Sequence, residues 1–309
     1  YSFFRDRVMF PVTDARGRVI AFGGRIMSGD GPKYINSPDH ALFHKGQLLY
    51  NFAKARGAAS RGAPFIVVEG YMDVIALFQF GIDNVVATMG TAVTSTHVKK
   101  LFRICDDIYY CFDGDSAGQK AAWRALERSL PLVTDTKAVH FLFLPKEHDP
   151  DSYIQQYGKH EFEMQLGQAK SLTEYLFSHQ EQLLGDGINT VEGRVQFVNL
   201  CKPLLSKVPE GVYKTILETE LAKRCNLSQT SLEKILMQSE SATAKSIGYQ
   251  NQSQLLNNAD LTNIQSRVQF RAGFRTRSSL WQQACFLLVH NPKFVELVPQ
   301  DLINDYITN

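Results

Sequence analysis

The chain has 309 residues, of which 44% are hydrophobic and 21% are charged, and its formal net charge is +2. This composition is typical of a globular protein and excludes a chain that is disordered throughout. No uninterrupted apolar run approaches the ~18 residues of a membrane-spanning helix, and the first residues are too charged for a signal peptide. The chain also begins without methionine, so we expect a fragment of a longer protein.

Residues 1–60 carry nine Lys and Arg against four Asp, a net charge of +5. Such a stretch suits phosphate binding, although a solvated surface explains the charge equally well. The five Cys are widely spaced and form no C-x-x-C motif. We therefore expect reduced thiols, no structural zinc site and a cytoplasmic location.

The N-terminal residues favour short strands. Apolar runs over 8–12 and 19–22 flank a turn over 14–17, a pattern that predicts a β-hairpin. We expect Gly23 and Gly24 to end the second strand, and a helix over 47–56 to follow. Residues 1–62 are thus predicted to form a small basic α/β subdomain.

Strand and helix patterns alternate over residues 63–158. The predicted strands cover 65–68, 85–87, 108–112 and 138–144, and the predicted helices cover 71–80, 95–103 and 116–130. This alternation with short connections predicts an α/β fold, with a parallel sheet and helices on both faces.

The remaining residues divide into three parts. Residues 159–238 carry apolar stripes at helical spacing and are predicted to form a helical bundle. Residues 239–265 are rich in Ser, Gln and Asn, which is typical of a linker. Residues 266–309 begin another helical module, so the chain as a whole is α+β.

Acidic residues follow two of the predicted strands. Glu69 comes directly after the first strand, and Asp113 and Asp115 come directly after the third. Ligands of open α/β sheets bind outside the carboxyl ends of the strands, and Asp73 lies one helical turn beyond Glu69. Clustered carboxylates repel one another unless a divalent cation lies between them, so this pattern predicts a Mg²⁺ site.

Simpler interpretations exist for some of these acids. Asp115 precedes a predicted helix and is a good helix cap. Asp149 and Asp151 follow the fourth predicted strand, where a turn is the simpler interpretation.

Several segments resemble known families. Residues 68–73 (VEGYMD) and 112–118 (FDGDSAG) are similar to the two signatures of the Toprim domain. Segments that resemble the bacterial DnaG-type primase family are 5–11 (RDRVMFP), 17–25 (GRVIAFGGR), 32–38 (PKYINSP), 43–46 (FHKG), 144–145 (LP) and 149–151 (DPD). The resemblance extends from residue 1 to about residue 237 and keeps the order of the family's motifs.

The resemblance implies a nucleotidyltransferase that synthesises short RNA primers on single-stranded DNA for replication. It implies a two-metal reaction with Mg²⁺, for which Mn²⁺ can substitute. The implied catalytic residues are Glu69, Asp113 and Asp115. The implied metal ligands are Glu69, Asp73, Asp113, Asp115, Asp149 and Asp151.

The resemblance also assigns the basic residues. Arg25, Lys33 and Lys45 match family positions that would contact the ribonucleoside triphosphate or the template. Tyr34 and Asn36 lie in the same motif, where Tyr34 suits either stacking on a base or packing. Arg5 and Arg7 are weaker candidates for the same surface.

The implied partners are single-stranded DNA, ribonucleoside triphosphates and the replicative helicase, the last through residues 266–309. The family works at the replication fork in the bacterial cytoplasm, away from membranes, and we expect a monomer. The family's N-terminal zinc-binding module and the start of its polymerase domain are expected to be missing from this chain.

Three alternatives remain open from the sequence. The first is another Toprim enzyme, such as a topoisomerase or a nuclease. The second is a non-catalytic module that binds DNA or the helicase. The third is a receiver-like or phosphatase-like fold, which would place Asp at the end of the first strand, where this chain has Glu69.

Overall fold

The computed structural model describes residues 3–236, so the predicted linker over 239–265 and the module over 266–309 lie outside the described residues.

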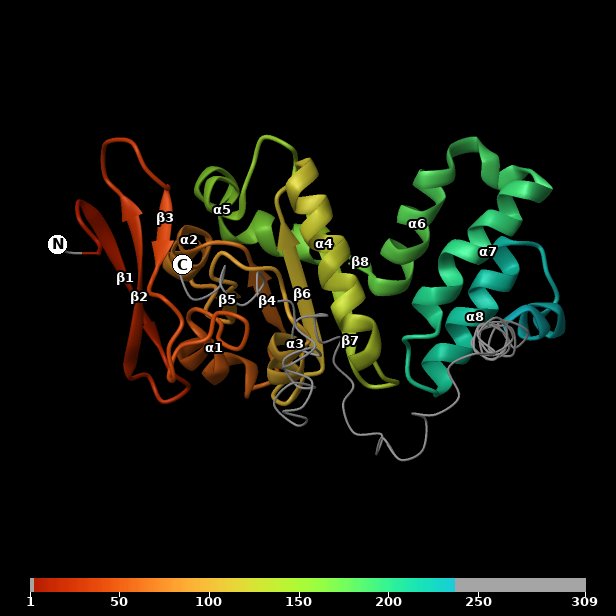
Figure 1. Ribbon diagram of the computed structural model, residues 1–309, viewed down its shortest axis with the longest axis horizontal. Coiled ribbons are helices and arrows are strands. Elements are labelled where there is room, and N and C mark those ends of the chain that lie inside the picture. Colours follow the sequence, from red (N-terminus) through yellow and green to blue (C-terminus); the bar gives the residue numbers. More distant parts are fainter. Residues whose placement is uncertain (1–2, 237–309) are drawn as a thin grey trace, which may run out of the picture. The chain divides into compact units, whose positions relative to one another are not determined.

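The first sheet is antiparallel, in the order β1-β2-β3 (Figure 1). Its strands are β1 (Arg7–Thr13), β2 (Val19–Ile26) and β3 (Tyr34–Asn36). The predicted hairpin is therefore confirmed and gains a third strand.

The prediction that Gly23 and Gly24 end the second strand is wrong, because β2 continues through both glycines. A Cβ atom on Gly23 would lie 2.6 Å from Cζ of Tyr71, and one on Gly24 would lie 2.8 Å from Cδ1 of Phe4. The two glycines are therefore places where aromatic rings lie directly on the strand backbone.

The helix predicted over 47–56 begins and ends later in the structure, as α1 (Phe52–Ala59). Tyr50 exchanges backbone hydrogen bonds with Ala87, so the chain just before Asn51 pairs with β5 and does not join the helix. Asn51 then takes a left-handed conformation with φ 63°. The helix continues through Gly57 because Ala58 and Ala59 are buried in the core.

The second sheet has the order β5-β4-β6-β7-β8. Its strands are β4 (Phe65–Val68), β5 (Val85–Ala87), β6 (Asp107–Phe112), β7 (Ala138–Phe143) and β8 (Lys170–Ser171). The first four are parallel, as predicted, and β8 is antiparallel. Sequence patterns missed β8 because two residues are too few to show a period.

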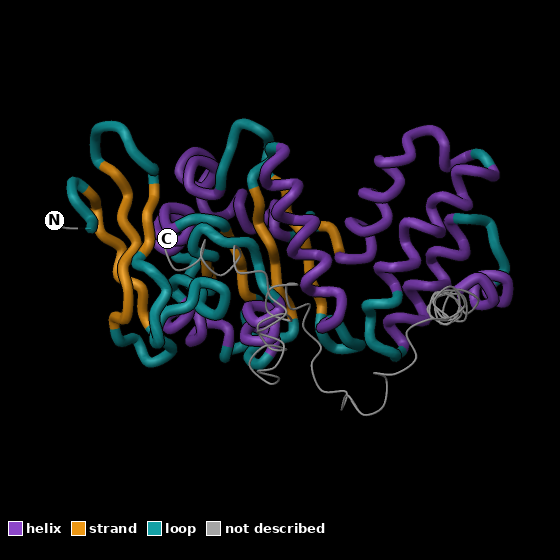
Figure 2. Tube along the Cα trace, in the orientation of Figure 1, coloured by secondary structure: helices purple, strands orange, loops and turns teal. Residues whose placement is uncertain are grey.

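Helices cover both faces of this sheet, as predicted (Figure 2). Ile66 and Val68 of β4 pack in the core with α2 (Tyr71–Gln79) and α5 (Pro150–Leu166). Phe65 and Val67 point to the other face. That face is covered by α1, α3 (Ser95–Phe102) and α4 (Ser116–Ser129). The strand that precedes Glu69 therefore belongs to two hydrophobic cores.

The chain continues into a group of helices, as predicted for this segment. They are α6 (Leu172–Leu184), α7 (Val191–Leu205) and α8 (Val212–Arg224), with the short 3-10 turn η2 (Gly185–Asn189) between α6 and α7. A further 3-10 turn, η1 (Leu130–Leu132), lies earlier in the chain, between α4 and β7. Phe177, Phe197 and Leu221 of these helices share a continuous core with the sheet. No helix among residues 3–236 is long and apolar enough to cross a membrane.

The expected division at residues 62/63 and 158/159 stays a prediction. The first boundary falls between α1 and β4. The second falls at Gly158, where α5 leaves helical geometry with φ 78° and ψ 177°. Phe162, beyond that kink, still packs in the core between α5 and the sheet.

Candidate active site

The strand order changes direction between β4 and β6. The chain passes from β4 to β5 on one side and then crosses to β6 on the other side. The connections leaving the carboxyl ends of β4 and β6 therefore diverge, and this is where open α/β sheets form their binding crevice. Glu69 follows β4 directly, and Asp113 follows β6 directly.

Short contacts hold the two acidic turns in place. The Gly70 amide donates to Oδ2 of Asp73 over 2.9 Å, which turns that carboxylate back toward the end of β4. Asp115 caps α4, because its Oδ1 accepts from the amides of Ala117 (2.9 Å) and Gly118 (2.8 Å). The capping interpretation of Asp115 is therefore confirmed, and its carboxylate stays beside the other acids.

Two glycines are required for the turn after β6. A Cβ atom on Gly114 would lie 2.3 Å from the carbonyl oxygen of Leu144, and one on Gly118 would lie 2.1 Å from the carbonyl oxygen of Asp113. Both distances are far inside van der Waals contact. The backbone around Asp113 is therefore closely packed against its neighbours, and this packing fixes the point from which the Asp113 side chain leaves the backbone.

A cavity of about 550 Å³ lies at this edge of the sheet. It brings together acids from the second sheet and basic or polar residues from the N-terminal region. The predicted site residues that line it are Glu69, Asp73, Asp113, Asp149, Lys33, Tyr34, Asn36 and Lys45. The acids and the cations thus line one cavity although they come from different parts of the chain.

The carboxylates in this cavity repel one another. Burial, followed by the charges of Asp113 and Asp115, raises the pKa of Glu69 to about 7. Burial, with the nearby charges of Asp149 and Asp113, raises the pKa of Asp73 to about 7. The pKa of Asp113 is also raised, by burial and by Asp149 and Asp115. The ionised form of each of these carboxylates is therefore disfavoured in this cavity.

The donor set fits a divalent cation that is shared with a substrate. Among residues 3–236, no three Asp, Glu, His or Cys side chains are placed to hold one ion between them. Mg²⁺ commonly takes only one or two carboxylates and fills its remaining positions with water and substrate phosphates. In the same part of the chain, no Lys or Arg forms an ion pair with Glu69, Asp73 or Asp113.

The opposite wall of the cavity carries positive charge around one aromatic ring. The guanidinium carbon of Arg25 lies 5.8 Å from the centre of the Tyr34 ring, and the ammonium of Lys33 lies 5.9 Å from it. Arg25 pairs with Tyr34 across β2 and β3 and does not itself line the cavity. Cations at this distance are attracted to the ring face, so Tyr34 holds both near the acids.

Three other predicted binding residues have structural partners. Asn36 donates to the carbonyl oxygen of Met89 over 3.0 Å and accepts from the Tyr71 hydroxyl. Arg7 donates to the carbonyl oxygen of Gly24 over 3.2 Å, and Arg5 pairs with Asp6 on the surface. Neither arginine lines the cavity.

Asp151 is the remaining predicted metal ligand. It lies in the first turn of α5, where its carboxylate accepts from the side-chain amide of Gln155. It does not line the cavity, whereas Asp149, the cap of α5, does. Asp149 also accepts from the amide of Ser152 over 2.7 Å, which fixes the carboxylate at the cavity's edge.

The structure of a DNA primase domain from Pseudomonas aeruginosa is similar over most of both chains. The two are 48% identical with a TM-score of 0.73, over 77% of this chain and 74% of that one. The chain belongs to the bacterial DnaG-type primase family. A DnaG primase catalytic domain solved with bound single-stranded DNA is 42% identical, with a TM-score of 0.71 over 75% of this chain and 73% of that one.

Sequence comparisons place the chain within longer DnaG-type primases. The DNA primase of Neisseria meningitidis is 50% identical over 241 residues, which are 77% of this chain but 40% of that protein. The Escherichia coli K12 primase is 43% identical over 237 residues, again 40% of its length. The chain thus spans about two fifths of the curated relatives it matches.

Three family descriptions match successive parts of the chain. The N-terminal domain of the DNA primase catalytic core matches residues 1–56, and the Toprim-like family matches residues 66–154. The DnaB-helicase binding domain of primase matches residues 174–230. This last match covers α6 to α8 and not residues 266–309, where the helicase-binding domain was expected to begin.

The cavity of this DnaG-type core also includes residues that the sequence analysis did not select. They are Phe3, Ile35, Gly70, Tyr71, Met72, Thr88 and Gly90. Thr88 follows the carboxyl end of β5, so the rule that identified Glu69 and Asp113 could have found it. Gly70, Tyr71 and Met72 follow Glu69 within the motif over 68–73, and Ile35 lies in the motif over 32–38, so those motifs could also have indicated them. Phe3 and Gly90 lie outside the quoted motifs.

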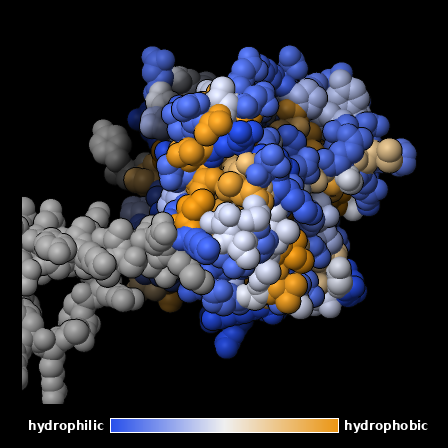
Figure 3. Space-filling view, turned by 90° about the vertical axis from the view of Figure 1, so that its right-hand side faces the viewer, coloured by the Kyte–Doolittle hydropathy of each residue, from blue (hydrophilic) through white to orange (hydrophobic). Residues whose placement is uncertain are grey.

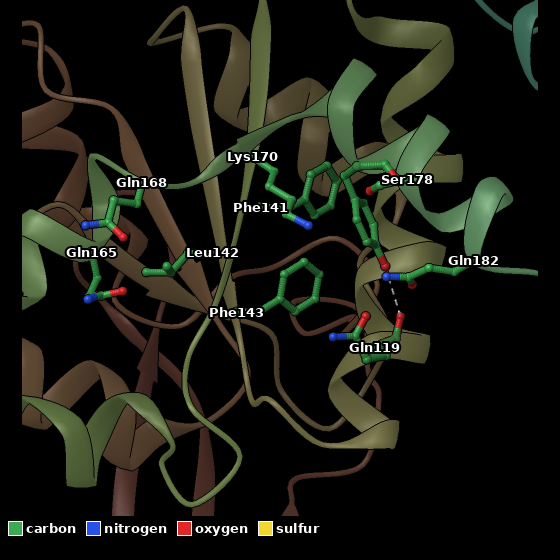
Figure 4. A pocket seen from close by; sticks show the side chains of 10 residues that line it. Gln119, Phe141, Leu142, Phe143, Gln165, Gln168, Lys170, Ser178 and Gln182 are labelled. Carbon is green, nitrogen blue, oxygen red and sulfur yellow. Dashed lines mark hydrogen bonds between the residues drawn. The ribbon is translucent and has the colours of Figure 1, made fainter. Parts of the chain in front are cut away.

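A second cavity of about 330 Å³ lies beside β7, α4 and α6 (Figure 4). Its polar lining is mostly amide, from Gln119, Gln165, Gln168 and Gln182, and the Tyr175 hydroxyl donates to the carbonyl oxygen of Gln119 over 3.4 Å. No carboxylate lines it. It therefore differs from the first cavity, which brings several carboxylates together.

Proposed function

We propose that this chain is the catalytic core of a DNA primase, which joins ribonucleotides into short primers on a single-stranded DNA template. The observation that carries the proposal is the single cavity in which acids after β4 and β6 face Lys33 and Lys45. The related catalytic domain with bound single-stranded DNA supports the choice of template. Membership of the DnaG-type family supports nucleotidyl transfer over the topoisomerase, nuclease and receiver-like alternatives.

In the proposed reaction, the 3′-hydroxyl oxygen of the growing primer bonds to the α-phosphorus of a ribonucleoside triphosphate, and pyrophosphate leaves. Glu69, Asp113 and Asp115, with Asp73, Asp149 and Asp151 around them, would hold Mg²⁺ or Mn²⁺. Such ions would supply positive charge that stabilises the phosphoryl oxygens during the transfer.

The chain's own residues position the reactants. Lys33 and Lys45 hold the triphosphate against the acidic wall, because an ammonium group is a mobile point charge that phosphate attracts. Arg25 adds charge behind Tyr34, whose ring is available to a base. Glu69 receives the proton that the hydroxyl loses. Most of the rate enhancement then comes from orientation and charge, as in other phosphoryl transfers.

Incorporation of labelled ribonucleotides on single-stranded DNA tests this proposal. We expect template-dependent products with Mg²⁺ or Mn²⁺, and none from the double variant Asp113→Asn/Asp115→Asn. Asp83→Asn is a matched control, because Asp83 is exposed and precedes β5 at the opposite edge of the sheet. Products that persist in the double variant would refute the site. Relaxation or cleavage of supercoiled plasmid would favour another Toprim enzyme.

We also propose that the helices α6 to α8 bind a replicative helicase. The match of residues 174–230 to the DnaB-helicase binding domain supports this placement. Exposed apolar side chains add to that support: Leu183, Val191, Val195, Val212 and Ile216. Figure 3 shows hydrophobic patches among polar atoms on the face that includes this end. The contribution expected from residues 266–309 lies outside the described residues and stays a prediction.

Co-elution with a DnaB-type helicase in size-exclusion chromatography tests the second proposal. Val191→Asp/Val195→Asp places two charges on one face of α7 and is expected to abolish co-elution. Val19→Asp is the control, because Val19 is equally exposed but lies on β2. Unchanged co-elution of the α7 variant would exclude this face.

A further inference from the structure

Lys45 reaches the acidic cavity from a segment without regular secondary structure. Residues 44–48 form turns between Phe43 and Leu49, which are both fully buried. The two buried residues hold the ends of the segment, but they do not fix the backbone between them. A lysine on such a segment needs further contacts if its ammonium group is to meet a phosphate at a fixed place.

One face of α3 supplies those contacts. Three successive carbonyl oxygens, those of Lys45, Gly46 and Gln47, each lie within hydrogen-bond distance of one side chain of α3 or of its N-cap, Thr94. Thr94 Oγ1 donates to Gly46 over 2.7 Å, and Lys100 Nζ donates to Gln47 over 3.1 Å. His97 Nε2 lies 3.0 Å from the oxygen of Lys45. Residues three apart on a helix share a face, so the three side chains form one row.

His97 is the buried centre of this row, with no exposed surface. Its Nδ1 accepts from the Thr94 amide over 3.3 Å, so this nitrogen carries no proton. The proton of the neutral ring is therefore on Nε2, which donates to the Lys45 carbonyl. Thr94 in turn accepts from the His97 amide over 3.1 Å. Each ring nitrogen has a hydrogen-bond partner, and the ring cannot rotate without losing these contacts.

We propose that His97, with Thr94 and Lys100, is a positioning residue that fixes the backbone of Lys45 so that its ammonium group binds the triphosphate of the incoming nucleotide. The inference rests on the proposed function and deepens it. His97 does not touch the substrate and acts through Lys45. Loss of the row is therefore expected to weaken nucleotide binding, while the acids keep their places.

Equilibrium binding of a fluorescent ribonucleoside triphosphate in Mn²⁺ is the first measurement. His97→Leu is expected to raise Kd about tenfold, since Leu fills the space without a donor, and His97→Gln, which keeps an N–H, is expected to restore most of the affinity. In primer synthesis, the same loss appears in KM more than in kcat. Circular dichroism confirms folding, and Thr94→Val replaces His97→Leu if the latter unfolds.

A double-mutant cycle separates positioning from general damage. Lys45→Ala alone is expected to weaken binding, and adding His97→Leu to it is expected to change nothing further. Additive losses would overturn the inference.

Lys100→Met and Lys99→Met form a matched pair, because both remove one charge from α3 but only Lys100 contacts the segment. Equal Kd values for these two variants would also overturn it.

The outcomes distinguish this inference from the proposed function. If the parent chain binds the nucleotide and His97→Leu binds it equally well, the inference is wrong and the proposed function stands. If the parent chain binds no ribonucleoside triphosphate at all, both are refuted together.

Discussion

The Tyr71 hydroxyl donates to the side-chain oxygen of Asn36 over 2.5 Å, and this hydrogen bond joins the N-terminal sheet to the start of α2. Asn36 continues the connection by donating to the Met89 carbonyl. The Tyr71 ring stacks on Phe10, with centroids 5.1 Å apart. Burial raises the pKa of Tyr71, so the hydroxyl stays a donor at any ordinary pH. This joint lies two residues from Glu69.

Tyr71→Phe is expected to lower the free energy of unfolding by about 1 kcal/mol, because Asn36 loses a partner while the ring packing remains. Urea denaturation measures the change. Tyr157→Phe is the control, because Tyr157 is exposed and, within residues 3–236, has only ring contacts. Equal stability of Tyr71→Phe and the parent chain would show that the joint contributes nothing.

Gly118→Ala is expected to lower the free energy of unfolding by about 1–3 kcal/mol, because the added methyl would collide with the Asp113 carbonyl. The collision moves Asp113, so kcat/KM for primer synthesis should fall by about tenfold or more. Gly187→Ala is the matched control, since nothing lies within 4 Å of a Cβ there. A fully active Gly118→Ala would contradict the close packing described after β6.

Asp113→Asn is expected to have opposite effects with and without metal. In EDTA it should raise the free energy of unfolding, because it removes a charge that burial and Asp149 disfavour. In Mn²⁺ the parent chain should gain stability by binding the ion, and the variant should gain much less. Thermal unfolding measures both. A variant less stable than its parent in EDTA would argue against repulsion among these acids.

His97 should make stability depend on pH. Burial lowers the pKa of His97 to about 4, helped by the Lys100 charge and opposed by the hydrogen bond to Lys45. The unfolded chain therefore binds this proton more readily than the folded one. The contribution is complete above pH about 6.5 and is lost as pH falls toward 4, by about 2 kcal/mol at pH 5.

Urea denaturation of the parent chain and His97→Gln at pH 7 and pH 5 checks this sign. The parent should lose more stability than the variant between the two values. Comparing the two chains removes the contribution of Glu69 and Asp73, whose raised pKa values act in the opposite direction. An equal loss in both chains would assign the pH dependence to other groups.

Much of the fold could be predicted because its signals are local. The strands 65–68, 85–87 and 108–112 are short apolar runs between helical patterns, and each run became a strand of the parallel sheet. The carboxyl-end rule then placed Glu69 and Asp113 at one edge, where they line the same cavity. Both results follow from the spacing of apolar residues along the sequence and from the common direction of the parallel strands.

Features that depend on distant contacts could not be predicted. Gly23 was expected to break a strand, but it is the site where the Tyr71 ring meets the backbone. The start of α1 depends on the pairing of Tyr50 with Ala87, two segments far apart in sequence. The hydrogen bond from His97 to Lys45 is made to a backbone oxygen. Every residue has such an oxygen, so no side-chain pattern could reveal this contact.

The shared position of β4 in two hydrophobic cores has a mechanical consequence. Ile66 and Phe65 are buried on opposite faces of β4, so helices on both faces hold this strand in place. The acidic wall that follows β4 is therefore a rigid frame. The basic wall is attached to that frame through the Asn36–Tyr71 joint and the Lys45 segment. A substitution that weakens either attachment would therefore change the distance between the basic residues and a fixed set of acids.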